Sequence, residues 1–203
     1  MKRPKFIARQ SGNPRGMVGR FIAWIMAKET SAVNDAVLAR LRLQADDQLL
    51  EVGFGHGHTV RRAADRVAFV GGVDVSPTML SVATRANRTA IADGKVELKL
   101  GDGITLDFED ARFDKLLSVH TIYFWTNPAA TLAEFHRVLR PGGRVVLAFN
   151  PAGAPRTQKF PDDIYTFYSD DQVRALLSEA GLETEDVVAI PDAVPHLAIA
   201  HRR

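Results

Sequence analysis

The sequence predicts an α/β protein whose core is an open, mostly parallel sheet of seven strands with helices on both faces. The first observation is that short apolar runs alternate with segments of helical periodicity from about residue 45 onwards. Such alternation is typical of a parallel sheet covered on both sides. The second is that an apolar run at 47–52 ends at a glycine-rich turn, which a helical pattern follows. A strand, a glycine turn and a helix form the nucleotide-binding corner of such sheets.

The individual elements follow from local patterns. The expected strands are short apolar runs bounded by turn-forming residues, and they lie at 47–52, 67–74, 96–100, 113–119, 139–147, 184–190 and 196–201. Apolar residues at helical spacing predict helices near 58–66, 77–92, 128–139 and 170–180. Ser76 before Pro77, and Ser169, are typical helix starts. A loose segment with three prolines, residues 150–169, precedes the last of these helices.

The composition excludes several classes of protein. The 203 residues are 46% hydrophobic and 25% charged, as in an ordinary globular chain. There is no cysteine, which excludes disulfides, thiolate metal sites and cysteine nucleophiles. No apolar run approaches the roughly 20 residues of a membrane-spanning helix. A chain without cysteine fits a reducing compartment, so we expect a cytoplasmic protein, with peripheral membrane association as an open alternative.

The most informative motif follows the first expected strand. Gly53, Gly55 and Gly57 alternate directly after a run that contains Glu51. The dinucleotide pattern G-x-G-x-x-G fails because His58 stands three positions after Gly55, and no Gly-Lys-Ser/Thr follows for a phosphate loop. An acid followed by alternating glycines suits a ligand without phosphate that carries a ribose and a cationic amino-acid moiety.

Further landmarks lie at the ends of later strands. The second expected strand ends at Asp74, and an acid at this place accepts ribose hydroxyls. The third ends near Asp102, and residues 139–147 read as a helix stop, a turn and a fifth strand. With the glycine motif, these landmarks resemble the class I S-adenosylmethionine-dependent methyltransferases, particularly the small enzymes that act on quinones, phospholipids and other small molecules. The resemblance covers about residues 45–203 and implies an antiparallel last strand and S-adenosyl-L-methionine as the cofactor.

The resemblance also implies which residues contact the cofactor. Asp74 is expected at the ribose diol and Asp102 at the adenine amino group, with His56 in the loop around the methionine part. The full expected set is Glu51, Gly53, Phe54, Gly55, His56, Gly57, Asp74, Val75, Met79, Asp102, Gly103 and Ser118.

Reacting groups are expected beside the sulfonium, at the ends of the fourth and fifth strands. Methyl transfer from a sulfonium is an in-line displacement that proximity and desolvation can largely supply. His120 and Tyr123 follow the fourth strand and are the expected catalytic residues, with His120 as a general base. His120 could instead be a wall residue that orients the substrate. Trp125 could line the acceptor pocket or anchor its loop.

We expect neither a metal nor a nucleic acid as a partner. His56 and His58 have no third ligand at suitable spacing. Residues 118–121 read Ser-Val-His-Thr where base-amino methyltransferases of this fold carry Asn/Asp-Pro-Pro-aromatic. The expected partner is a small-molecule methyl acceptor, methylated at oxygen, nitrogen or carbon, and no oligomeric state is predicted. The alternatives are a lipid- or quinone-directed enzyme at the membrane surface and a non-catalytic module that binds the cofactor.

Residues 1–44 are expected to form a basic helical extension, and residues 45–203 the cofactor-binding domain. Residues 1–28 carry seven cations and no acid, a net charge of +7, whereas the other 19 basic and 24 acidic residues give −5. A helix is expected over 17–27, with Val18, Phe21, Ile22 and Ile25 on one face, and a second one is expected after a cap at Thr30 or Ser31. We expect the first helix to be a lid over the cofactor. An anchor on an anionic bilayer and a mitochondrial presequence are the alternatives.

Overall fold

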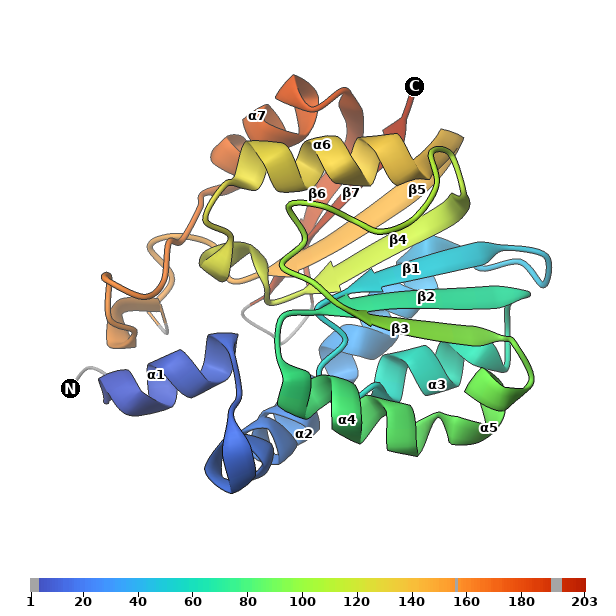
Figure 1. Cartoon of the computed structure of the whole chain (residues 1–203). Coiled ribbons are helices and arrows are strands. Elements are labelled where there is room, and N and C mark those ends of the chain that lie inside the picture. The colour runs from blue at the N-terminus through green and yellow to red at the C-terminus, as the bar shows by residue number, and fades with distance from the viewer. Residues whose placement is uncertain (1–3, 156, 191–194) are drawn as a thin grey trace.

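The structure, a computed structural model, describes residues 4–155, 157–190 and 195–203, with side chains in these ranges except at 18 and 22–29. Its centre is a seven-stranded sheet in the order β3-β2-β1-β4-β5-β7-β6 (Figure 1). The strands are β1 (Gln48–Val52), β2 (Phe69–Asp74), β3 (Val96–Leu100), β4 (Phe113–Val119), β5 (Leu139–Phe149), β6 (Leu182–Ala189) and β7 (His196–Arg202). Only β7 runs antiparallel to its neighbours, β5 and β6. The predicted sheet, with its antiparallel last strand, is confirmed.

Helices cover both faces of this sheet, as predicted. They are α1 (Lys5–Gly12), α2 (Gly16–Leu41), α3 (His58–Ala64), α4 (Pro77–Ala86), α5 (Arg88–Ala92), α6 (Pro128–Val138) and α7 (Asp170–Glu179), with short 3-10 turns η1 (Ile122–Phe124) and η2 (Thr157–Lys159). Figure 1 shows α2, α3, α4 and α5 below the sheet and α6 and α7 above it. Side chains of neighbouring residues in the central strands point to opposite faces of the sheet. Leu49 and Leu117 pack on the side of α2 and α3, whereas Leu50 and Leu116 pack on the side of α6 and α7.

The strand order opens a crevice at the carboxyl end of β1. The chain goes from β1 outwards through β2 to β3, and then returns to place β4 on the other side of β1. Ligands of open α/β sheets bind at such a reversal of strand order. The glycine turn after β1, Asp74 at the end of β2 and His120 after β4 all stand at this edge of the sheet.

The amino-terminal helices differ from the prediction. Helix α2 continues through Thr30 and Ser31, so the predicted break at these residues is wrong. The reason is packing: Val33, Val37 and Leu41 are buried against the sheet and hold the helix from its far end. None of the described helices, α2 included, is long and apolar enough to cross a membrane. The division of the chain at residue 44 stays a prediction, although the second half of α2 packs into the same core as the sheet.

Two more boundaries depart from expectation. Helix α1 was not predicted; it is a short, basic segment with one buried residue, Ala8. The predicted helix 77–92 is interrupted at Asn87 and forms α4 and α5. The Asn87 amide donates to the carbonyl of Gly57 at 3.1 Å and to that of Ala83 at 2.9 Å, which ties the end of α4 to the glycine turn.

Candidate active site

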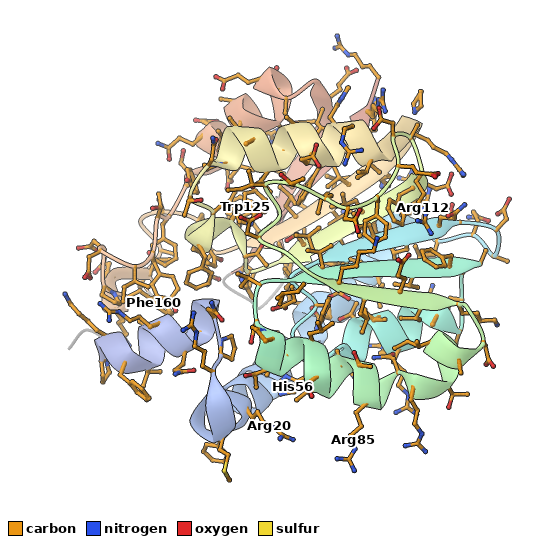
Figure 2. The ribbon with its side chains drawn as sticks, in the orientation of Figure 1. Arg20, His56, Arg85, Arg112, Trp125 and Phe160 are labelled. Carbon is orange, nitrogen blue, oxygen red and sulfur yellow. The ribbon has the colours of Figure 1, made fainter. Side chains whose placement is uncertain are left out.

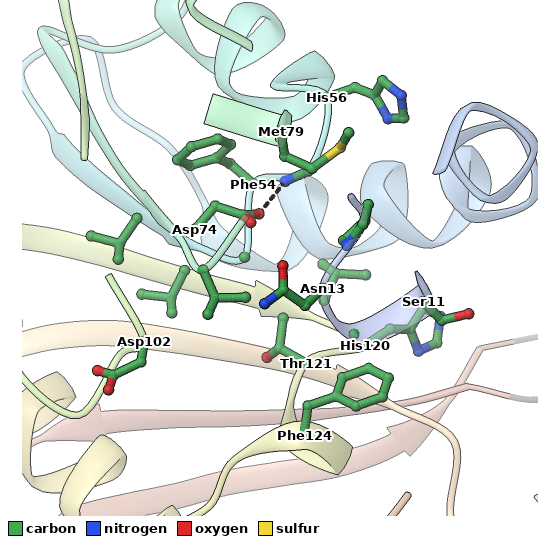
Figure 3. Close-up of a pocket in the computed structure, with 18 of the residues that line it drawn as sticks. Ser11, Asn13, Phe54, His56, Asp74, Met79, Asp102, His120, Thr121 and Phe124 are labelled. Carbon is green, nitrogen blue, oxygen red and sulfur yellow. Dashed lines mark hydrogen bonds between the residues drawn. The ribbon is translucent and has the colours of Figure 1, made fainter. Parts of the chain in front are cut away.

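A cavity of about 780 Å³ opens at the carboxyl ends of β1, β2 and β4. Pockets for ligands of drug size span roughly 300–1,000 Å³, so this cavity lies towards the upper end. The glycine turn and strand-end acids form one side, the segment after β4 forms a second, and α1 with the turn before α2 closes a third (Figure 3).

The three glycines of the turn all have positive φ, at 85°, 52° and 71°, but their surroundings differ. A Cβ atom on Gly53 would lie 2.2 Å from Cγ2 of Thr121, so only glycine allows this approach of the two strand ends. A Cβ on Gly57 would meet Ala83 and Asn87, each at 2.7 Å. Gly55 borders the cavity with nothing within 4 Å of its Cβ position, which leaves its backbone open to a ligand.

Asp74 connects the glycine turn to the end of β2. Its buried carboxylate accepts a hydrogen bond from the Gly55 amide at 2.8 Å (Figure 3) and a second one from the Ser76 amide at 2.9 Å. Burial raises the pKa of Asp74, and these two hydrogen bonds oppose the rise. Because each carboxylate oxygen has a further lone pair, Asp74 can still accept from a ligand hydroxyl in the cavity that it lines.

Glu51 places a second buried acid beside Asp74. Its Oε2 is buried and has no hydrogen-bond partner in the described part of the chain. Burial, and then the neighbouring charge of Asp74, raise the pKa of Glu51 well above its ordinary value. A buried acid oxygen without a partner is costly, and a cationic ligand group would satisfy it. Glu51 lines the cavity, so the donor and acceptor set fits a ligand with a ribose and an ammonium group.

Glu51→Gln is expected to make the ligand-free protein more stable at neutral pH. The unfolded chain releases the Glu51 proton at its ordinary pKa, whereas the folded protein holds it to a higher pH. Between these two pKa values the folded state binds more protons, so the free energy of unfolding falls as the pH rises. Urea unfolding from weakly acidic to neutral pH should show a shallower fall in Glu51→Gln, with the exposed Glu109→Gln as a control that keeps the wild-type slope. If the free energy of unfolding fell equally with pH in all three proteins, the raised pKa of Glu51 would be contradicted.

Directly after β4, His120 is held in an unusual backbone conformation, with φ at 58°. Its amide donates to the Ala148 carbonyl at 2.8 Å, and its Nδ1 lies 3.0 Å from the Tyr123 hydroxyl. That hydroxyl also accepts a hydrogen bond from the Asn150 amide. Tyr123 is buried, so it orients the imidazole from behind, between the ends of β4 and β5.

An apolar wall stands next to His120. Phe124, Trp125 and Ile164 line the cavity. Behind them the rings of Tyr123 and Phe124 contact Tyr165 and Phe167 of the segment after β5, and Phe160 packs against both of the latter rings. Trp125 also packs edge-on against Phe135, with ring centroids 5.5 Å apart, so it both lines the cavity and anchors its loop.

The amino-terminal segment crosses the cavity from this wall to the end of β2. At the wall, the ring of Phe124 approaches Gly12 so closely that a Cβ there would lie 2.7 Å from Cδ1. At the other end, the Ser76 hydroxyl donates to the Pro14 carbonyl. Between these points Asn13 directs its amide into the cavity, between Asp74 and Thr121 (Figure 3). The Asn13 Oδ1 is buried and has no partner in the described residues.

The start of α2 lies against the glycine turn. The His56 ring contacts the backbone of Arg20, and burial lowers the pKa of His56. Side chains on the predicted apolar face at Val18, Ile22 and Ile25 lie outside the described residues, whereas Phe21 is 62% exposed.

Most of the predicted site residues meet at this cavity. Those that line it are Glu51, Gly53, Phe54, Gly55, His56, Asp74, Val75, Met79, Asp102 and His120. Gly57, Gly103, Ser118 and Tyr123 lie outside the lining. Ser118 is buried and donates to the Val52 carbonyl at 2.7 Å, which holds β1 and β4 together. The individual contacts of these residues with a ligand stay predictions.

Sequence reasoning did not identify Asn13, Thr121, Phe124 or Ile164 as site residues. Asn13 and Ile164 come from segments far from β1–β4 in sequence, and no motif marks them. Phe124 could have been found, because it lies in the same aromatic stretch after β4 as Tyr123 and Trp125.

The fold and this cavity define an α/β protein that binds a nucleoside-type cofactor where the strand order reverses. Residues 50–147 match the model of a methyltransferase domain family. The chain is 29% identical over 170 residues to the 27-O-demethylrifamycin SV methyltransferase of Amycolatopsis mediterranei, covering 79% of this chain and 62% of that protein. It is 29% identical over 166 residues to the uncharacterized methyltransferase YdaC of Bacillus subtilis, covering 81% and 87%.

A solved structure gives the same picture of the fold. The geranyl diphosphate C-methyltransferase of Streptomyces coelicolor, solved with Mg²⁺, geranyl diphosphate and S-adenosyl-L-homocysteine, superposes with a TM-score of 0.76 at 16% identity, over 95% of this chain and 86% of that one. Residues 50–147 are thus a methyltransferase domain, and the chain has the fold of the class I S-adenosylmethionine-dependent methyltransferases. It spans less than two thirds of the length of the rifamycin relative.

Proposed function

We propose that this protein transfers the methyl group of S-adenosylmethionine to a small-molecule acceptor bound between His120 and the apolar wall. The observation that carries this proposal is the continuity of one cavity, which joins the buried acids Glu51 and Asp74 to His120 and Phe124. Cofactor and acceptor therefore share a space from which the amino-terminal segment excludes water.

Each part of the cavity has a distinct task in this proposal. When bound, the cofactor supplies a methyl group already activated on a sulfonium. Glu51 and Asp74 orient its ammonium group and ribose. His120 takes the proton of the acceptor at Nε2, in the neutral tautomer whose Nδ1–H donates to the Tyr123 hydroxyl. Gly12 and Asn13 act as the lid, because Gly12 packs on Phe124 and the Ser76 hydroxyl donates to the carbonyl of the next residue, Pro14.

The wall defines the kind of acceptor that this site would take. Phe124, Trp125 and Ile164 offer aromatic and aliphatic surface to the body of a ligand, while His120 and Asn13 offer polar atoms near the transferred group. An acceptor with an apolar ring or chain and an ionisable hydroxyl, amine or activated carbon fits this arrangement.

The proposal is tested by incubating the full chain with methyl-labelled S-adenosylmethionine and a panel of phenols, quinols, prenylated compounds and amines. Saturable label transfer to one class is expected. Phe124→Ala should then raise the KM for that acceptor roughly tenfold, while binding of S-adenosylhomocysteine in calorimetry stays unchanged. Cofactor binding without transfer to any acceptor would instead favour a non-catalytic module, and transfer only to acceptors in vesicles would favour a lipid-directed enzyme.

A further inference from the structure

Exposed apolar side chains gather at the amino-terminal end of the molecule. Six large hydrophobic residues are exposed in the described part of the chain, and four of them, Phe6, Ile7, Met17 and Phe21, lie on α1 or the first turns of α2. Met17 is 85%, Phe21 62% and Phe6 58% exposed. Figure 1 shows α1 and the start of α2 next to each other at the border of the molecule, away from the sheet. Single exposed hydrophobic residues are ordinary, but a cluster marks an interaction surface.

Cations are interspersed among these apolar residues. Arg9, Arg15 and Arg20 are exposed, and no salt bridge joins them to a carboxylate in the described residues, although Lys5 and, more weakly, Arg9 are near enough to Asp163 to lower the pKa of that carboxyl. Figure 2 shows Arg20 on α2, extending away from the sheet. Lys5 is the exception, since its ammonium lies 2.7 Å from Asp163. Residues 1–28 carry +7 in total against −5 for the other residues, so the charge is strongly asymmetric.

We propose that this amino-terminal corner, defined by Phe6, Arg9, Arg15, Met17, Arg20 and Phe21, docks on the surface of an anionic lipid bilayer. Cations interspersed with exposed aromatic and aliphatic side chains suit the headgroup region, where the apolar groups enter the acyl boundary and the cations meet anionic lipids. The net negative charge of the remaining chain is repelled by the same surface, which fixes the orientation with the corner facing the membrane.

Docking in this orientation places the cavity at the bilayer. Arg9 and Arg15 line the cavity as well as belonging to the corner, so the bilayer adjoins the cavity mouth. An apolar acceptor could then enter from the membrane. The docking itself is independent of the proposed methyl transfer, because it depends only on the outer surface of α1 and the start of α2.

Sedimentation of the full-length protein with sucrose-loaded vesicles tests the proposal. We expect binding to an equimolar mixture of phosphatidylcholine and phosphatidylglycerol, and much weaker binding to phosphatidylcholine alone. The double variant Met17→Ser with Phe21→Ser should lose roughly tenfold or more in the vesicle partition coefficient. The double variant Arg15→Gln with Arg20→Gln should lose a similar factor and much of the salt dependence.

Matched variants elsewhere on the surface control for general effects. Leu100→Ser removes a hydrophobic residue that is 54% exposed on β3, and Arg85→Gln with Arg88→Gln removes two exposed cations near the junction of α4 and α5; both should bind vesicles as the wild type does. Calorimetry with S-adenosylhomocysteine should give wild-type affinity for Met17→Ser with Phe21→Ser, which shows that the variant is folded.

Several results would overturn the proposal. Two of them are no vesicle binding by the wild type and an equal loss in the Leu100 control. A dimer in sedimentation velocity that the Met17 and Phe21 substitutions dissociate would assign the corner to a second copy of the chain instead. Tight binding of duplex RNA that is lost in the arginine variant would assign it to nucleic acid and equally contradict the lipid proposal.

Discussion

His120→Asn is expected to lower the turnover of an identified acceptor by roughly 100-fold or more, without weakening the binding of S-adenosylhomocysteine. A general base contributes to proton removal from the acceptor, not to the cofactor contacts, which we propose lie at Glu51 and Asp74. Asparagine is chosen because the φ of 58° at His120 disfavours most side chains, whereas asparagine tolerates the left-handed conformation. Label transfer measures kcat, and calorimetry measures the affinity for S-adenosylhomocysteine.

Tyr123→Phe is the matched control for this prediction. It removes the hydroxyl that engages His120 Nδ1 and accepts from the Asn150 amide, but it keeps the ring in the aromatic cluster. We expect a smaller loss of kcat and a shifted pH profile of kcat, because the hydroxyl acts through the imidazole. A wild-type kcat with a raised KM in His120→Asn would contradict the proposed role of His120 as general base. His120 would then be a wall residue that orients the substrate.

Gly53→Ala is expected to weaken S-adenosylhomocysteine binding by roughly 100-fold. A new Cβ would lie 2.2 Å from Thr121 Cγ2, at a residue whose φ is 85°. Thr121 cannot easily give way, because its hydroxyl is hydrogen-bonded to Ser118, which is in turn bonded to the Val52 carbonyl. The turn would have to move away from β4. Backbone strain of this kind costs about 1–3 kcal/mol before the steric overlap is added.

Gly94→Ala is the control that separates the effect of backbone strain from the effect of a steric overlap at the glycine turn. Gly94 also has positive φ, at 71°, but nothing lies within 4 Å of its Cβ position and it is far from the cavity. Thermal unfolding should show a loss of stability in both variants, whereas calorimetry should show the loss of affinity in Gly53→Ala alone. An equal affinity for the cofactor product in both variants would mean that the turn is not part of the cofactor site.

The parts of the site that could be predicted are those set by local sequence. A strand that ends at alternating glycines fixes where Glu51 and Gly55 stand, and parallel strand ends bring Asp74 to the same edge, so short patterns were sufficient. The antiparallel last strand, β7, followed from the family resemblance and is confirmed, whereas the order of the strands was not predicted.

The remaining features depend on contacts between distant segments. Thr30 and Ser31 are typical cap residues, yet α2 runs through them because Val33 and Val37 are buried on the sheet, and tertiary packing overrides a weak local preference. Asn13 lies at the cavity because its two neighbours are held by distant residues: Gly12 packs on Phe124, and the Pro14 carbonyl accepts a hydrogen bond from Ser76. Nothing within the amino-terminal segment itself indicates that contact.

A crystal structure of the full chain with S-adenosylhomocysteine tests the central claim most directly, namely that one cavity holds the cofactor beside the acceptor site. We expect the ribose hydroxyls on Asp74, the ammonium group on Glu51, and the sulfur directed at the space between Asn13 and His120. A sulfur that faces away from His120, or a cofactor that displaces the segment at residues 12–16 from Phe124 and opens the cavity to solvent, would contradict the account.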